Sequence, residues 1–404
     1  MNVAIIGGGA AGFFAAIAAK ENFPDAKVTI YEKSQKLLSK VKISGGGRCN
    51  VTNGCTDIKE LALAYPRGGK KLRKAFGKFN TLHTMEWFES RGIPLVIQDD
   101  NCVFPVSQDS QSIIDCFFLE TKRLGINIEI GCGVKTLLPK NQQWKMDFIN
   151  SSTESEIVDK IIIATGGSPK RSGLEWLENM GHQIEEPVPS LFTFNMPNEP
   201  VKELMGIVIE DVSVNIQGTQ LKSSGPLLIT HWGMSGPAIL KLSAFGARTL
   251  SEKKYGFNLQ VNWVHIQNSE LVADELRNIC EEHANKKLSN YRPYALKERL
   301  WIYLIEKCEF TKEITWSQIG KKGINKLMNI LTNDVYEVKG KTTFKEEFVT
   351  CGGISLDNIN FKTMQSNICP NIYFAGELLD IDGITGGYNF QAAWTTAFIA
   401  GKLK

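Results

Sequence analysis

The 404-residue sequence lacks the long apolar segment that a membrane-spanning helix requires. No apolar run reaches the roughly 18 to 20 residues needed to cross a bilayer, and the N-terminus lacks the basic stretch of a secretory signal peptide. Low-complexity segments are absent too, and 43% hydrophobic against 22% charged residues is the balance of a globular protein. We therefore expect a cytoplasmic protein of two or three domains with no membrane partner.

Metal-ligand and disulfide patterns are missing as well. The nine cysteines include no C-x-x-C pair, and none of the five histidines lies at ligand spacing from a cysteine pair. An odd number of cysteines in a chain without a signal peptide favours free thiols over disulfides. The sequence therefore predicts no metal site.

A strong excess of either charge is also absent. Lys and Arg total 46 and Asp and Glu total 43, and the resulting net charge of +3 is too small to indicate a nucleic-acid partner. We expect no nucleic-acid partner on this ground. A local basic cluster fits either an anion site or, more commonly, a solvated helix face. Its members are Arg67, Lys70, Lys71, Arg73, Lys74 and Lys78.

A glycine-rich turn near the N-terminus carries the strongest local pattern. Apolar strands are predicted over residues 3–6 and 28–31, and an alanine-rich helix over 10–20. The first strand and the helix are joined by the G-x-G-x-x-G of residues 7–12. In this context Gly7 permits the tight turn, Gly9 admits a pyrophosphate, and Gly12 allows close packing of helix on strand. Glu32 ends the second strand, where a carboxylate accepts hydrogen bonds from ribose hydroxyls, so we expect a dinucleotide without a 2′-phosphate.

The rest of the chain predicts that this nucleotide-binding domain is interrupted by an insert. Apolar strands over 160–164 and 372–375 and a last helix over 389–403 match the first part of the chain. Residues 191–265 alternate like half-exposed antiparallel strands, with a helix beginning at Ser235-Gly236-Pro237 and capped by the serine. Helices are predicted over 269–286, 294–307 and 316–331. The predicted fold class is α/β: a discontinuous Rossmann-type domain (1–190 and 341–404), an inserted β-rich subdomain (191–267) and a small all-helical subdomain (268–340).

The kind of dinucleotide is indicated by two segments far from the N-terminal turn. Ala164-Thr165-Gly166-Gly167 follows a buried strand and suits backbone contact with an extended cofactor from a second side. Gly376-Glu377 ends another strand, and the glycine-rich residues 383–391 lead into the last helix, whose N-terminus favours negative charge. An NAD site needs no such return from the C-terminal part. We therefore predict that the Rossmann-type domain binds FAD.

These segments, with residues 44–53 and 230–237, resemble the bacterial NAD(P)- and FAD-dependent oxidoreductases described as aminoacetone oxidase-like or bile-acid-reductase-like flavoproteins. The resemblance covers nearly the whole chain, and residues 44–53 and 376–391 are its most specific parts. It implies a Rossmann-type FAD domain with an insert made of a β-barrel-like part and a helical part. It also implies that residues 44–50 line the cofactor, with Arg48 near phosphate.

The predicted cofactor-binding residues come from several separate segments. They are Gly7, Gly9, Ala10, Ala11, Gly12, Glu32, Lys33, Lys40, Ser44, Gly45, Gly46, Arg48, Cys49, Asn50, Val134, Ala164, Thr165, Gly166, Gly376, Glu377, Gly386, Gly387, Tyr388 and Asn389.

Candidates for catalytic residues are few. His231 precedes the Ser-Gly-Pro helix start and fits a flavin-facing acid or base, or a histidine bonded at a turn. Tyr388 fits a contact with substrate or flavin, or a packing role. Cys49 and Cys55 are separated by five residues rather than the four of flavin disulfide reductases, so Cys49 is better explained as a small buried contact than as part of a redox dithiol.

The sequence thus predicts an FAD-dependent oxidoreductase that transfers a hydride at flavin N5, between NAD(P)H and a small organic substrate. A second G-x-G-x-x-G after a strand is absent, so NAD(P)H is expected to dock transiently as a co-substrate. Three alternatives stay open: an amine oxidase-like flavin oxidase that passes electrons to O2, a flavin-bearing RNA-modifying protein, and an NAD-binding module without flavin. The substrate and the oligomeric state are not specified by the sequence.

Overall fold

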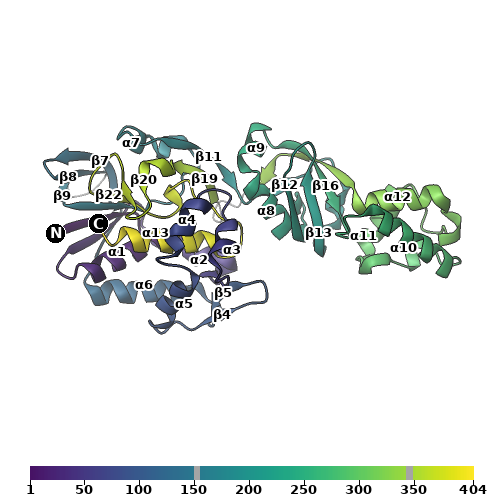
Figure 1. Ribbon diagram of the computed structural model, residues 1–404, viewed down its shortest axis with the longest axis horizontal. Helices are drawn as coiled ribbons and strands as arrows, with labels where there is room; N and C mark the ends of the chain where they lie inside the picture. The colour runs from purple at the N-terminus through teal and green to yellow at the C-terminus, as the bar shows by residue number, and fades with distance from the viewer. Residues whose placement is uncertain (150–154, 343–348) are drawn as a thin grey trace. The chain divides into compact units, whose positions relative to one another are not determined.

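The computed structural model describes residues 1–149, 155–342 and 349–404 (Figure 1). The chain forms two compact units. Unit 1 comprises Met1–Ser190 and Phe344–Lys404, and unit 2 comprises Leu191–Thr343.

Unit 1 is built on a 7-stranded sheet. Its order is β20 (Ile359–Asn360), β21 (Gln365–Ser366), β22 (Ile372–Phe374), β10 (Lys160–Ile163), β1 (Asn2–Ile6), β2 (Lys27–Glu32) and β6 (Asn127–Ile130). The pairs from β22 to β6 are parallel, and β20 and β21 are antiparallel. Strands buried on both faces need unbroken apolar runs, which the central strands have. The carboxyl ends of the parallel strands meet at one edge of the sheet, here called the carboxyl edge.

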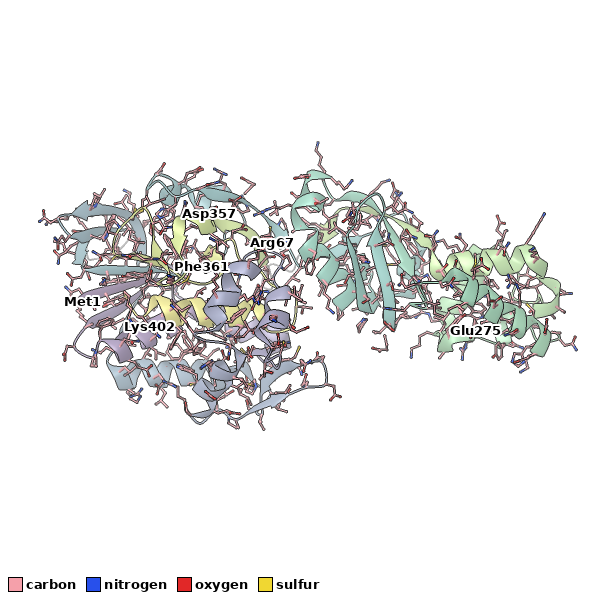
Figure 2. The ribbon with its side chains drawn as sticks, viewed as in Figure 1. Met1, Arg67, Glu275, Asp357, Phe361 and Lys402 are labelled. Carbon is pink, nitrogen blue, oxygen red and sulfur yellow. The ribbon has the colours of Figure 1, made fainter. Side chains whose placement is uncertain are left out.

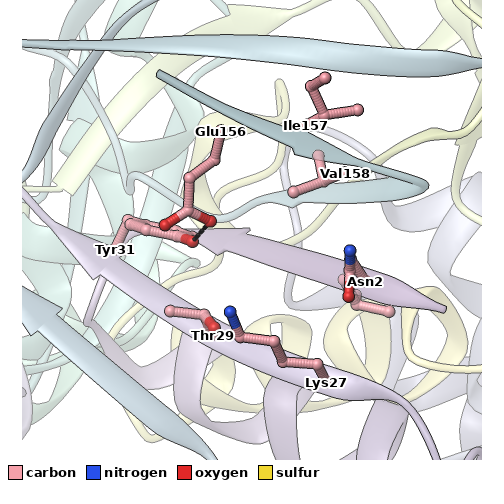
Figure 3. Close-up of a pocket in the computed structure, with 8 residues that line it drawn as sticks. Asn2, Lys27, Thr29, Tyr31, Glu156, Ile157 and Val158 are labelled. Atoms are coloured by element: carbon pink, nitrogen blue, oxygen red, sulfur yellow. Dashed lines mark hydrogen bonds between the residues drawn. The ribbon is translucent and has the colours of Figure 1, made fainter. Parts of the chain in front are cut away.

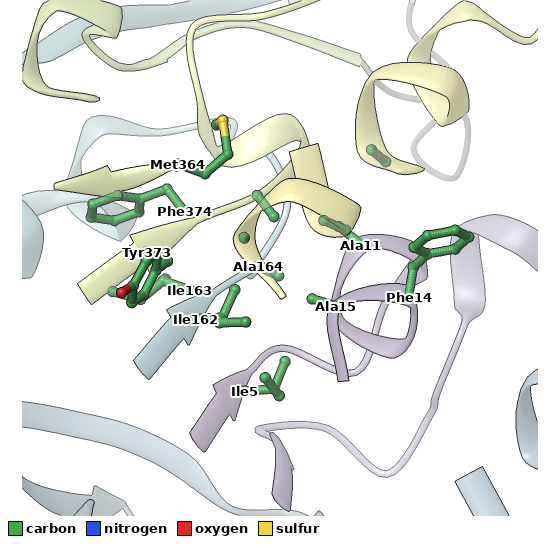
Figure 4. Close-up of a cluster of buried hydrophobic side chains, with 14 of the residues drawn as sticks. Ile5, Ala11, Phe14, Ala15, Ile162, Ile163, Ala164, Met364, Tyr373 and Phe374 are labelled. Carbon is green, nitrogen blue, oxygen red and sulfur yellow. The ribbon is translucent and has the colours of Figure 1, made fainter. Parts of the chain in front are cut away.

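Helices α1 (Ala10–Asn22) and α13 (Tyr388–Ala400) pack against each other in unit 1. A Cβ at Gly401 would lie 2.6 Å from the Ala18 Cβ, so small residues set this close approach. Figure 4 shows Ala11, Phe14 and Ala15 of α1 in one buried cluster with residues of β1, β10 and β22. The predicted strand-helix-strand unit and the C-terminal return of the Rossmann-type fold are therefore confirmed.

The remaining elements of unit 1 surround this core. Strands β3 (Thr52–Asn53), β5 (Cys102–Pro105) and β4 (Leu95–Ile97) form one small sheet, and β7 (Gly133–Lys140), β8 (Gln143–Ile149) and β9 (Ser155–Val158) form another. A third pair joins β11 (Ile184–Ser190) to β19 (Val349–Ile354), with Ser190 opposite Val349. The further helices are α2 (Ser39–Gly47), α3 (Ile58–Leu63), α4 (Gly69–Phe76), α5 (Thr81–Glu89), α6 (Ser110–Leu124) and α7 (Glu175–Glu178), and the short η7 spans Gly376–Leu378.

Unit 2 combines a second 7-stranded sheet with helices. The sheet order is β17 (Asp334–Lys339), β16 (Gly256–Asn262), β13 (Val208–Ile216), β14 (Lys222–Ile229), β15 (Gly233–Ser235), β12 (Thr193–Asn195) and β18 (Lys341–Thr342), all antiparallel. The helices are α8 (Pro237–Phe245), α9 (Ala247–Glu252), α10 (Ser269–Glu282), α11 (Glu298–Lys307) and α12 (Gly320–Thr332). One buried cluster includes residues of both the sheet and α10–α12. The division at 267/268 into two subdomains stays a prediction.

Helix α8 begins differently from the sequence-based expectation. Pro237 is the first residue of α8, as predicted, but the expected Ser235 N-cap is wrong. Gly236 is the N-cap, with φ of +89°, and Ser235 lies in β15, where its Oγ accepts a hydrogen bond from Thr193 Oγ1 (2.9 Å). In the ranges 1–149, 155–342 and 349–404, every helix is too short or too polar to cross a membrane.

Candidate functional site

The glycines of the N-terminal turn differ in how much space surrounds them. Gly7 has φ of +115°, and a Cβ there would lie 2.4 Å from the Ala164 carbonyl oxygen. A Cβ at Gly12 would lie 1.9 Å from the Gly7 oxygen. A side chain at either position would therefore collide with the backbone, so close packing requires glycine there.

Free space surrounds the Cβ position of Gly9, whereas the Cβ positions of Gly7 and Gly12 are blocked by backbone atoms. Gly9 is the N-cap of α1 with φ of −95°, and a Cβ there would meet no atom within 4 Å. No side chain caps this helix end, and its first turn carries no acidic residue. The free space at Gly9 thus lies beside a positive helix end, which is a cradle suited to a phosphate group.

Glu32 lies at the carboxyl edge, where β2 ends. Its Oε2 accepts a hydrogen bond from the Gly8 N–H (2.7 Å), and its Oε1 accepts one from the Ser34 N–H (2.8 Å). The carboxylate is therefore held beside the glycine turn. The structure places the predicted ribose-binding acid next to the predicted phosphate cradle.

Lys33 and Val134 lie next to this acid. The Cys132 N–H donates to the Glu32 carbonyl (2.8 Å), which brings the start of β7 against the end of β2. A Cβ at Gly133 would lie 3.3 Å from the Lys33 Cβ. Lys33 therefore packs against Gly133, the residue directly before Val134 in β7.

Residues 44–50 form a glycine loop that interrupts α2. Ser44 leaves the helical conformation, and Gly45, Gly46 and Gly47 have φ of +57°, +69° and +85°. A Cβ at Gly46 or Gly47 would meet no atom within 4 Å. The Arg48 guanidinium lies over the Phe104 ring, 4.1 Å from its centroid. The loop therefore presents open backbone, as a cofactor contact requires.

This loop touches the glycine-rich turn before α13. Gly387 has φ of +85°, and a Cβ there would lie 2.2 Å from the Thr52 oxygen and 2.8 Å from Asn50 Oδ1. The Asn53 amide donates to the Gly386 oxygen (3.0 Å). The two segments that the family resemblance marked as most specific are thus in contact.

Asn389 holds that turn together. Its Oδ1 accepts from the Gly383 N–H (2.8 Å) and its Nδ2 donates to the Gly383 oxygen (3.0 Å). Both ends of the side-chain amide are used inside the turn. Its predicted contact with the cofactor stays a prediction.

Lys40, Glu377 and Thr350 meet where β10 and β22 end. Lys40 Nζ lies 2.6 Å from Glu377 Oε2, and the Thr350 N–H donates to Glu377 Oε1 (2.9 Å). A Cβ at Gly167 would lie 2.7 Å from both Glu377 Oε1 and Thr350 Oγ1. Lys40, Gly167 and Glu377 were predicted from the sequence, but Thr350 was not. The only sequence feature that could have indicated Thr350 is its position just before Gly352-Gly353.

The Thr350 hydroxyl is buried and has no hydrogen-bond partner among the described residues. Thr350→Val is therefore expected to raise the unfolding free energy of the cofactor-free protein by about 1 kcal/mol, because an unpaired buried hydroxyl is costly. Urea unfolding measures this change. The control is Thr193→Val, which removes the bond to Ser235 and is expected to cost about 1 kcal/mol. Destabilisation by Thr350→Val would show that its hydroxyl is paired in the folded protein.

A buried ion pair that the sequence did not reveal secures the turn before α13. Asp382 is fully buried, and its carboxylate accepts from Arg67 Nε (2.6 Å), from Arg67 Nη2 and from Ser190 Oγ (2.7 Å). Burial raises the pKa of Asp382, and the Arg67 guanidinium opposes that rise. Arg67 was noted only as part of a basic cluster, because its partner lies 315 residues away.

Tyr388 is the first residue of α13 and follows the Gly386-Gly387 turn. Burial raises the pKa of Tyr388 to about 12, with smaller contributions from Cys55, Cys102 and Asp100. An ordinary tyrosine is already protonated at neutral pH, and the raised pKa extends that protonated range upward. The Tyr65 hydroxyl donates to the Tyr388 carbonyl oxygen (2.7 Å), which fixes the start of the helix.

The Cys49 thiol is buried, and burial raises its pKa to about 12. We expect Cys49 to resist iodoacetamide at pH 8, with a thiolate fraction about 1,000-fold below that of an ordinary thiol. The half-buried Cys55 is expected to react faster, and peptide mass spectrometry measures both. Because the folded pKa is raised, the thiol's contribution to stability holds below about pH 9 and falls as the pH rises toward 12. Equal alkylation of the two cysteines in the folded protein would contradict this expectation.

His231 belongs to unit 2. It is exposed in the turn between β14 and β15, with its ring centroid 4.6 Å from that of Trp232. The turn is closed by the Thr230 N–H donating to the Gly233 oxygen (2.8 Å). A catalytic role for His231 stays a prediction.

A separate pocket lies along β1, β2 and β9 (Figure 3). It is lined by Asn2 and Val3 at the start of β1, by Lys27, Thr29 and Tyr31 along β2, and by Glu156, Ile157 and Val158 of β9. Within it the Tyr31 hydroxyl donates to Glu156 Oε2 (2.5 Å), as the dashed line shows. Across the described ranges, no group of three or more His, Cys, Asp or Glu is arranged to hold a metal ion.

The segments that gather at the carboxyl edge of unit 1, together with the fold, define the class of protein. The glycine turn, the acid after β2, the turn after β10 and the glycine-rich return before α13 gather in unit 1, and open space remains at Gly9, Gly46, Gly47 and Gly166. These residues fit FAD, since a long dinucleotide needs backbone access at several strand ends. The class is that of flavoproteins with a Rossmann-type FAD-binding fold and an inserted β-sheet unit.

The chain belongs to the family described as "HI0933-like protein Rossmann domain", whose model matches residues 1–403. This is a family of FAD-binding oxidoreductases. The predicted family resemblance and fold class are both confirmed.

Curated relatives span the whole chain. It is 27% identical over 417 residues to a "3-dehydro-bile acid delta(4,6)-reductase" of Clostridium scindens, with 99% of this chain and 98% of the relative covered. It is 26% identical over 408 residues to a "Ribosomal RNA dihydrouridine synthase" of Escherichia coli, with 98% and 95% covered.

A solved structure shares the fold. It is the 3-ketosteroid-delta4-(5alpha)-dehydrogenase from Rhodococcus jostii, with a TM-score of 0.51, 11% identity and coverage of 99% of this chain and 96% of that chain.

Proposed function

We propose that the chain is an FAD-dependent reductase that adds hydrogen across a ring C=C bond conjugated to a carbonyl group. The names of both curated relatives describe this chemistry: a delta(4,6) reductase saturates ring double bonds of a ketone, and dihydrouridine is uridine with its ring double bond saturated. The reacting group is a ring C=C bond conjugated to a carbonyl in each case. Relatives that match over nearly the whole chain support the same reaction class here.

The residues proposed to hold FAD follow the strand order of the sheet. Glu32 ends β2, Gly9 follows β1, Ala164–Gly166 follow β10, and Gly376-Glu377 follow β22. A dinucleotide along the carboxyl edge would place its adenosine ribose at Glu32 and its pyrophosphate at Gly9. Its flavin half would lie toward Lys40, Glu377 and Gly386-Gly387. When bound, FAD supplies hydride transfer at N5.

The observation that carries the proposal is the Tyr388 phenol. Reduction of a conjugated C=C bond needs a hydride at the β-carbon and a proton at the α-carbon. Tyr388 starts α13 beside the glycine turn, and its phenol is protonated at neutral pH, as an ordinary tyrosine is. We assign it the transfer of that proton, after which solvent reprotonates the phenolate. NAD(P)H supplies the hydride, so one NAD(P)H and one proton are consumed per bond reduced.

Anaerobic stopped-flow mixing tests this function. NADH or NADPH is expected to bleach the flavin absorbance near about 450 nm, and a 3-keto-4-ene steroid is expected to restore it while gaining two hydrogens by mass. Failure of both nicotinamides to bleach the flavin would overturn the NAD(P)H assignment. Recovery of the absorbance with O2 but with no conjugated carbonyl compound would identify an oxidase instead.

A further inference from the structure

Helix α4 and the residues after it carry cations without acids. Residues 70–78 contain five basic residues and no Asp or Glu. The apolar residues of this stretch, Leu72, Ala75 and Phe76, are buried, whereas the basic residues are exposed. The outer face of α4 therefore offers charge and no apolar anchor.

Folding adds cations from two distant segments. Lys78 Nζ donates to the Lys362 oxygen (2.5 Å), which joins the turn between β20 and β21 to the end of α4. The pKa of Lys78 is lowered by burial and by the nearby charges of Lys402, Lys404 and Lys362. We call this surface the basic face; its members are Lys70, Lys71, Arg73, Lys74, Lys78, Lys362, Lys402 and Lys404.

Few acids compensate the basic face. Asp357 lies 3.4 Å from Lys71, with a mostly exposed carboxylate, and Asp57 lies near Arg73. Figure 2 marks Asp357, Phe361 and Lys402 on unit 1. The half-buried Phe361 ring lies beside Lys71, with Nζ 6.0 Å from its centroid. A small net charge for the whole chain thus coexists with a strongly positive local surface.

We propose that the basic face binds the phosphate backbone of RNA. A surface of mostly exposed cations matches a regularly charged polymer, and the Phe361 ring beside Lys71 offers a stacking surface for a base. A membrane surface is a poorer fit, because membrane-docking helices expose apolar residues and α4 buries its own. The uracil ring of RNA carries a C=C bond conjugated to a carbonyl, so the substrate assignment, though not the docking, rests on the proposed function.

The test uses the full-length, FAD-loaded protein and a labelled single-stranded RNA of about 20 nucleotides containing uridines. The triple variant Lys70→Glu, Arg73→Glu and Lys74→Glu is expected to weaken RNA binding at least about 10-fold and to make the salt dependence shallower by about two to three phosphate contacts. The control Lys297→Glu, Lys321→Glu and Lys322→Glu makes the same charge change on exposed residues of unit 2 and is expected to alter binding less than about 3-fold.

Three outcomes overturn the proposal: no RNA binding by the unchanged protein at 50 mM KCl, equal losses in both variants, or binding to phosphatidylglycerol vesicles in place of RNA. Reduction of a 3-keto-4-ene steroid is measured in parallel. If RNA binds through the basic face but no conjugated carbonyl compound is reduced, the proposed function fails while the docking surface stands. If the steroid is reduced but RNA does not bind, only the docking surface fails.

Discussion

Gly9→Val is expected to give a folded protein that no longer retains FAD. The position has φ of −95°, which any residue adopts, and no protein atom lies within 4 Å of the added Cβ. The valine side chain would instead occupy the space in front of α1, where the pyrophosphate is proposed to bind. Loss of about two charge-assisted hydrogen bonds corresponds to FAD affinity weaker by roughly 100-fold or more. Fluorescence titration with FAD and circular dichroism of the cofactor-free protein measure binding and folding separately.

Two further glycines serve as controls. Gly12→Val is expected to lower the stability of the cofactor-free protein severely, because its Cβ would lie 1.9 Å from the Gly7 oxygen. Gly256→Val in unit 2, where the nearest atom to an added Cβ is 3.6 Å away, is expected to leave FAD affinity unchanged. Tight FAD binding by Gly9→Val would refute the placement of the pyrophosphate at this turn.

Tyr388→Phe is expected to slow reduction of a conjugated carbonyl substrate by about 100- to 10,000-fold, the range for loss of a general acid. Bleaching of the flavin by NAD(P)H is expected to stay within about 3-fold of the original rate, since hydride transfer to the flavin needs no proton from this phenol. Stopped-flow measurement of the two half-reactions separates these effects. A slowed first half-reaction with a normal second one would assign Tyr388 to nicotinamide binding instead.

Tyr65→Phe is the matched control for Tyr388→Phe. The two rings lie edge to face with centroids 6.0 Å apart, and Tyr65 donates its hydroxyl to the Tyr388 backbone. Removing that bond is expected to cost stability of about 1 kcal/mol and to change the second half-reaction by less than about 10-fold. Equal losses in the two variants would indicate that both tyrosines act only through the geometry of the turn.

The elements that could be predicted from the sequence are those determined by local pattern. The strand-turn-helix over residues 2–22 follows from an apolar run, three spaced glycines and an alanine-rich stretch, each of which acts within a few residues. A repeat of this pattern near the C-terminus predicted that β22 joins the same sheet and that α13 belongs to the same domain. The family and the FAD-binding fold were identified on the same segments.

The features that the sequence did not reveal depend on partners far along the chain. Nothing near Arg67 indicates that its guanidinium is neutralised by Asp382, and nothing near Thr350 indicates a carboxylate 27 residues later. The Ser235 N-cap failed for a related reason. A serine before Gly-Pro is a good cap in isolation, but its hydroxyl is engaged by Thr193 from a neighbouring strand, and Gly236 alone tolerates the backbone conformation at the helix start.

The pairing of Ser190 with Val349 has a consequence for how such a chain can arise. The chain leaves unit 1 after Ser190 and is paired there again at Val349, on adjacent antiparallel strands. To the nucleotide-binding unit, all of unit 2 is therefore topologically a single hairpin loop. A long loop costs little more closure entropy than a moderate one. An ancestral flavin-binding unit with a short turn at this position could thus have acquired a second folding unit without any change in its sheet order.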